Sequence, residues 1–137
     1  MNNASAYTIR CNTCHSCSPP SLTVKSKDST ISAITIGYVA GVFKIDDNQN
    51  AVIVKISKDL FIAYTNLTKA LVSKDQKIEK GTIIGNASLN IDHNLFEIEI
   101  FLATPEGNYL NEKNILELVQ EANNISIAAV CDATVLN

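Results

Sequence analysis

The sequence predicts a mostly β, antiparallel domain of the sandwich or barrel type, with one short C-terminal helix. Short segments rich in β-branched residues follow one another with polar turns between them, and only one segment has helical periodicity. The chain has 137 residues, of which 46% are hydrophobic. This size and content suit one domain whose core needs no crosslinks.

The strands are predicted where apolar residues concentrate or alternate with polar ones. In the segment 95–101, Glu97 and Glu99 alternate with Phe96, Ile98 and Ile100, so that one face packs and the other meets water. The other predicted strands are 31–42, 51–56, 60–64, 82–85, 125–130 and 134–136. The predicted sheet core consists of Val42, Val52, Val54, Ile56, Ile83, Phe96, Ile98 and Ile100.

The one predicted helix covers residues 111–122. Asn111 suits the N-cap and Glu112 the first turn, because a side-chain acceptor and a negative charge both stabilise a helix N-terminus. An apolar stripe follows at Ile115, Leu118, Val119 and Ala122.

Two parts are expected along the chain: a cysteine-rich N-terminal segment, 1–20, and a β-domain, 21–137. The first part is polar, holds three of the four cysteines and ends in Pro19-Pro20, which interrupts regular pairing. The net charge is −3 without a long run of one sign, so neither nucleic acid nor an anionic membrane is an expected partner. No signal peptide or membrane span is recognised, and the expected location is cytoplasmic or particle-associated.

Four segments in a fixed order resemble the M23 (LytM-type) metallopeptidase domain. That family shows a glycine-valine strand, a Tyr-x-His-Leu hairpin, a glycine-containing turn ending in Ile-Gly, and then His-x-His-Phe-Glu-Ile. The matching segments here are Gly41-Val42, Tyr64-Thr65-Asn66-Leu67, Lys80-Gly81-Thr82-Ile83-Ile84-Gly85 and His93-Asn94-Leu95-Phe96-Glu97-Ile98. The resemblance covers just over half of the chain and implies an antiparallel β-sandwich of the barrel-sandwich type.

The departures from this family concern its zinc site. The resemblance implies ligands from an upstream His-x-x-x-Asp motif and from the second His of His-x-His, because imidazole and carboxylate suit catalytic zinc. Leu95 stands at that second His, Asn66 at the Tyr-x-His-Leu histidine, and Val24 at the first motif's His, with Asp28 at its Asp. The sequence therefore predicts a domain that is not an enzyme and holds no catalytic zinc. His93 is expected to be a polar residue at a strand entrance.

The cysteines form a second candidate site. Cys11, Cys14 and Cys17 are spaced by three, and Cys131 lies near the C-terminus. Such spacing lets thiolates converge on one metal, so the four are predicted to bind zinc or an iron–sulfur cluster. His15 is a substitute for one of them. Unbound thiols and disulfides are the alternatives, the latter requiring export.

The expected function is a catalytically inactive M23-like domain that binds proteins or serves as a structural part of a larger assembly. The resemblance implies a phage-tail or contractile-injection-type particle, or cell-envelope machinery, with other proteins or peptidoglycan as partners. The alternative is a peptidoglycan-directed zinc endopeptidase with an unorthodox metal site built from Asp28, His93 or the cysteines. A carrier or phosphotransfer domain is the third interpretation, for which Lys80 has no matching motif.

Overall fold

β-branched and aromatic residues are frequent in the segments that form strands, as expected for side chains that pack on a pleated surface. The computed structural model describes residues 4–10, 21–92, 94–110, 114, 117–118 and 134–136. The strands in this part of the chain are β1 (Ala4–Arg10), β2 (Ser21–Ser26), β3 (Thr30–Ser32), β4 (Gly37–Asp46), β5 (Gln49–Ser57), β6 (Leu60–Ala70), β7 (Lys77–Ile78), β8 (Ile83–Asn90), β9 (Leu95–Ala103) and β10 (Thr134–Leu136).

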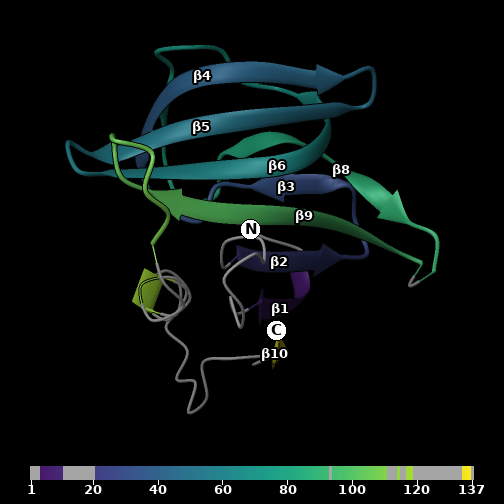
Figure 1. Cartoon of the computed structure of the whole chain (residues 1–137). Helices are drawn as coiled ribbons and strands as arrows, with labels where there is room; N and C mark the ends of the chain where they lie inside the picture. The colour runs from purple at the N-terminus through teal and green to yellow at the C-terminus, as the bar shows by residue number, and fades with distance from the viewer. Residues whose placement is uncertain are drawn as a thin grey trace.

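These strands form one antiparallel sheet in the order β10-β1-β2-β9-β8-β6-β5-β4-β7, with β3 paired to β8. Strand β9 also pairs with β6, so the sheet curls back on itself. Figure 1 shows β4, β5, β6 and β9 side by side, with β2 and β1 continuing the same layer below them. The predicted mostly β, antiparallel fold is confirmed. Asn114, Glu117 and Leu118 are helical and lie inside the predicted helix.

The predicted strands 51–56, 60–64 and 95–101 lie within β5, β6 and β9. The prediction of one strand over 31–42 is wrong, because β3 ends at Ser32 and β4 starts at Gly37. The interruption has long-range causes: the Ala33 amide donates to the Thr82 carbonyl at 2.8 Å, and the Gly81 amide donates to the Ala33 carbonyl at 2.9 Å. These bonds hold the segment against a turn, which a hydrophobic run cannot reveal.

Within the predicted N-terminal segment, residues 4–10 form β1, which pairs with β2 on one side and β10 on the other. The sheet therefore joins this strand to the β-domain. Residues 11–20 lie outside the described part of the chain.

The core lies on the face formed by the inward residues of β2, β4, β5, β6 and β9. Four predicted core residues, Val52, Val54, Ile98 and Ile100, are buried as predicted. Ile56 and Phe96 are partly buried and pack against the core. Further fully buried side chains, which the prediction did not include, are Leu22, Ile31, Ile62, Tyr64, Leu67, Ile78, Ile84 and Leu102.

Two predicted core residues are wrong: Val42 is 38% exposed and Ile83 is 39% exposed. Strand β7 pairs with β4 only at Gly37 and Tyr38, so that Val42 lies on an outer strand beyond this pairing. Ile83 is the first residue of β8 and lies at a register shift in the β3–β8 pairing. Both errors follow from long-range pairing, which local alternation does not determine.

Tyr64 anchors the interruption between β3 and β4. Its side chain is fully buried, and its hydroxyl accepts a hydrogen bond from the Ile34 amide at 3.1 Å. Burial raises the pKa of Tyr64 well above its ordinary value, since the phenolate would lose its hydration. The same tyrosine begins the Tyr-x-x-Leu segment, and Leu67 at its end is also buried.

Replacing Tyr64→Phe is expected to lower the free energy of unfolding at pH 7 by about 1–3 kcal/mol, because the buried Ile34 amide loses its acceptor. Above the ordinary tyrosine pKa, only the unfolded chain releases the Tyr64 proton. The wild-type free energy of unfolding therefore falls with rising pH, by up to about 1.4 kcal/mol per pH unit from this group. Urea denaturation of both proteins should show that the difference between their free energies of unfolding becomes smaller as the pH rises from 7 to 11. A constant difference would contradict the buried, protonated phenol.

Candidate functional site

The position matched to the first zinc ligand is occupied by Val24, in the middle of β2. Val24 pairs with Ile98 of β9 and is 2% exposed, so its side chain is part of the hydrophobic core. Asp28 follows β2 in a tight turn, where its amide donates to the Ser26 hydroxyl at 3.0 Å and its Oδ1 accepts from the Thr30 amide at 3.1 Å. The Asp28 carboxylate thus stabilises the turn between β2 and β3.

The position matched to the second zinc-binding His is Leu95, the first residue of β9. It is partly buried and pairs with Asn90 of β8. Its matched neighbour, His93, lies outside the described residues.

Asn66 occupies a bulge in β6. Val52 pairs with Tyr64 and Asn50 pairs with Leu67, so Thr65 and Asn66 together oppose the single residue between them in β5. The extra residue is accommodated by a left-handed backbone at Asn66, with φ 65°, which asparagine tolerates better than most residues. The Ser88 hydroxyl donates to the Asn66 carbonyl at 3.1 Å and links the bulge to β8.

A polar hollow of about 260 Å³ surrounds this bulge. Its lining residues come from β5, β6, β8 and β9 and are Gln49, Asn66, Ser88, Leu89, Asn90 and Glu97. Amide, hydroxyl and carboxylate groups of this kind can hold a polar ligand by hydrogen bonds. Of the residues that line this hollow, the family resemblance marks only Asn66 as a site position. The other lining residues come together only through the pairing of β8 with β9 and β6.

Two carboxylates continue this polar surface along β9. The Lys25 ammonium lies 3.9 Å from Glu97 Oε1, and the Ser21 hydroxyl donates to Glu99 Oε2 at 2.7 Å. The Thr65 hydroxyl donates to the Glu99 carbonyl at 2.9 Å. Glu97 and Glu99 share the outward face that the alternation of β9 predicts. Their partners depend on the β2–β9 register, which the sequence pattern does not give.

The resemblance implies a catalytic zinc bound by side chains at these matched positions. A catalytic zinc needs nitrogen, oxygen or sulfur ligands, and the alkyl side chains of Val24 and Leu95 have none. Within residues 21–92, 94–110 and the few described helical positions, no group of three or more His, Cys, Asp or Glu side chains could hold a metal. Among the matched positions that the structure describes, only Asp28 carries an atom that commonly binds zinc in catalytic sites.

The predicted cysteine site falls outside the described part of the chain. Cys11, Cys14, Cys17 and Cys131 all lie outside the described residues, as does His15. Their convergence on zinc or an iron–sulfur cluster stays a prediction.

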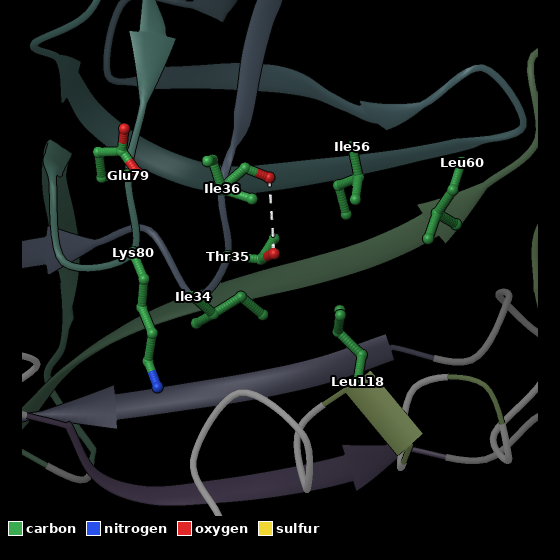
Figure 2. A pocket seen from close by; sticks show the side chains of 8 residues that line it. All are labelled: Ile34, Thr35, Ile36, Ile56, Leu60, Glu79, Lys80 and Leu118. Carbon is green, nitrogen blue, oxygen red and sulfur yellow. Dashed lines mark hydrogen bonds between the residues drawn. The ribbon is translucent and has the colours of Figure 1, made fainter.

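A second cavity, of about 410 Å³, opens beneath the β5–β6 hairpin. Figure 2 shows Ile56 and Leu60 on one side of it, Leu118 from the helical residues opposite them, and Ile34 to the left between the two. Lys80 and Glu79 line its rim, and the Thr35 hydroxyl donates to the Ile36 carbonyl at 3.5 Å. The cavity extends the apolar core, and its polar lining residues are Thr35, Glu79 and Lys80.

None of the described helical residues form a helix long and apolar enough to cross a membrane.

No family model and no curated protein matches this sequence. Solved structures do match its fold. The catalytic domain of the prophage-encoded M23 protein EnpA from Enterococcus faecalis, determined as a point mutant, aligns with a TM-score of 0.59 at 15% identity and covers 77% of this chain and 88% of that one. The catalytic domain of the antimicrobial peptidase lysostaphin from Staphylococcus simulans gives a TM-score of 0.59 at 13% identity, covering 84% of this chain and 93% of that domain.

Three further matches describe larger structures. The SpoIIQ–SpoIIIAH pore-forming complex aligns with a TM-score of 0.56 at 21% identity and covers 78% of this chain and 70% of that one. The chain spans 47% of the lysostaphin solution structure and 38% of a zinc-containing peptidase from Vibrio cholerae. The match is therefore to one domain of these longer proteins.

Proposed function

Because this chain has the fold of M23 peptidase domains, we propose that it is a catalytically inactive M23-like domain that binds another protein within a larger assembly. The observation that carries the proposal is the burial of Val24, which the sequence resemblance matches to a zinc ligand and which is 2% exposed in the hydrophobic core. Leu95 stands at the second His of the His-x-His motif, and Asn66 stands at the Tyr-x-His-Leu histidine. An alkyl group cannot bind zinc, and an amide is not a general base at neutral pH.

The assembly part of the proposal is supported by the contexts in which the same fold occurs. One matched structure is a pore-forming complex, and another is a prophage-encoded protein. A phage-tail or injection-type particle and cell-envelope machinery are both consistent with these contexts. Protein partners are proposed ahead of peptidoglycan, because no hydrolytic chemistry is proposed for the domain.

Incubating the pure protein with purified cell wall and added zinc is expected to release no soluble muropeptides. We expect this result because the side chains of Val24, Leu95 and Asn66 supply neither the zinc ligands nor the general base of the family. A chelator-treated sample supplies the baseline. Release above that baseline would overturn the proposal, and loss of this release in Asp28→Asn would then indicate a zinc endopeptidase with an unorthodox metal site.

The binding part has a separate test. Purification from the native source under non-denaturing conditions should yield the protein in a defined complex, whose composition mass spectrometry would identify. Elution as a monomer in every fraction would contradict the assembly role without restoring the enzymatic one.

A further inference from the structure

The outward face of the sheet is apolar over one part and acidic over another. Cross-strand pairing determines this face, because directly paired residues share one side of a sheet. Ile53 pairs with Gly41 and with Ala63, and Ala63 pairs with Phe101. These residues alternate with the core residues of their strands and therefore lie on the opposite side from the core.

Within the described part of the chain, five Phe and Tyr side chains lie on this outward face. Tyr38 and Phe43, both on β4, are each 53% exposed, and Tyr109 is 58% exposed. Phe61 and Phe101 are partly buried beside them, and the rings of Phe101 and Tyr109 meet edge to face with centroids 5.8 Å apart.

The residues that lie between these rings are small. Gly41, Ala51, Ala63 and Ala103 lie on the same side of the sheet. The Phe43 ring lies over Gly41, where an added Cβ would come within 2.8 Å of it. Exposed aromatic rings around small residues form a surface that an extended chain can cover, and large exposed apolar patches commonly mark interaction sites.

The charged groups on this face are separated along it. Glu97 and Glu99 lie on the first half of β9 beside β2, where the Lys25 ammonium is 3.9 Å from Glu97 and the Ser21 hydroxyl donates to Glu99. Two carboxylates and one ammonium leave this end with a net negative charge. Lys55 lies at the other end, where it pairs with Phe61 and Tyr38. A positively charged group on a ligand would be attracted to the glutamate end and repelled at the Lys55 end, which gives the face a direction.

We propose that this graded face, defined by Tyr38, Phe43, Phe61, Phe101, Tyr109, Glu97 and Glu99, binds an extended segment of the partner protein. The segment carries bulky apolar side chains over the aromatic rings and a Lys or Arg side chain at the end that lies over Glu97 and Glu99. This inference rests on the proposed protein-binding function and specifies the chemistry of the partner. Aromatic side chains with a charged group at the border are typical of protein-binding surfaces.

The test uses three synthetic ten-residue peptides and the full chain. The first alternates Leu and Phe in its centre and ends in Arg-Lys; the second ends in Glu-Glu instead; the third keeps Arg-Lys but has a Ser-Gly centre. Fluorescence anisotropy should show saturable binding of the first, with at least tenfold weaker binding of the other two. Amide shifts in the NMR spectrum should map this binding to β4, β5, β6 and β9.

Substitutions of the exposed aromatic residues test whether the peptide binds to the graded face. The double substitution Phe43→Ser with Tyr109→Ser should weaken the first peptide at least tenfold, and Glu97→Gln should weaken it severalfold. Ile91→Ser is the matched control, because Ile91 is 84% exposed and lies in the turn between β8 and β9, outside this face. Circular dichroism of each variant would verify folding.

Three results would overturn the inference: no peptide binds, the acidic and basic peptides bind equally, or Ile91→Ser weakens binding as much as the ring variants do. Binding of soluble peptidoglycan fragments to the face in place of the peptides would also overturn it, by assigning the surface to a glycan. The hydrolysis assay is independent of these peptides. A failure of the proposed function is therefore distinguishable from a failure of this inference.

Discussion

Ile98→Ala is expected to lower the free energy of unfolding by about 2–5 kcal/mol. Ile98 lies at the centre of β9 with no exposed surface and pairs with Val24, which is buried in the same core. Removing its outer carbons leaves a cavity that the paired strands on both sides of β9 cannot close. Urea denaturation followed by circular dichroism would measure the change.

Ile83→Ala is the matched control for this substitution, because Ile83 has the same side chain but is 39% exposed at the start of β8. Its cost should stay below about 1 kcal/mol, since less apolar surface is buried there. Equal losses in the two variants would mean that the inward and outward residues of β9 are wrongly assigned.

Gly85→Ala should have the second large effect, a loss of about 1–3 kcal/mol or more from overpacking. A Cβ on Gly85 would lie 2.4 Å from the Lys69 carbonyl oxygen and 3.3 Å from a Leu67 methyl carbon. The obstacle is backbone of a paired strand, so β6 and β8 would have to separate where β8 also pairs with β3. A thermal or urea melt of the variant provides the measurement.

Gly41→Ala tests whether crowding against a side chain lowers the free energy of unfolding less than crowding against backbone does. Its new Cβ would meet only the Phe43 ring, at 2.8 Å, and that ring is 53% exposed and can rotate toward solvent. We expect it to cost less than half of the Gly85→Ala loss. A larger loss at Gly41 would show that the Phe43 ring is held in place more firmly than its exposure indicates.

The alternation in β9 shows which parts of the fold can be predicted. Ile98 and Ile100 face the core and Glu97 and Glu99 face outward, as the period-two pattern predicts. The break between β3 and β4 was not predicted, since it depends on hydrogen bonds from Ala33 and Ile34 to a distant turn and to the Tyr64 hydroxyl. Alternation is a local property, whereas these bonds join segments that are far apart in the chain.

The candidate site was also predicted only in part, because some of its features depend on long-range pairing. The four sequence segments around Gly41, Tyr64, Gly85 and Phe96, which follow one another in the order of the M23 family, predicted the fold. The match to solved M23 structures confirms it. The left-handed backbone of Asn66 was not predicted, because it results from an unequal number of residues in paired strands. The pairing of Lys25 with Glu97 likewise requires the β2–β9 register, for which the sequence offers no signal.

The insertion of β9 between β2 and β6 imposes an order on folding during synthesis. Strands β4, β5 and β6 are consecutive and can pair as soon as they leave the ribosome. Strand β2 waits for β9: Ser21 and its partner Glu99 are 78 positions apart. At translation rates of about 5–20 residues per second, that delay is roughly 4–16 seconds. During this interval Leu22 and Val24, which end in the core, have no sheet partner in β9 and expose apolar surface to chaperones and to neighbouring nascent chains.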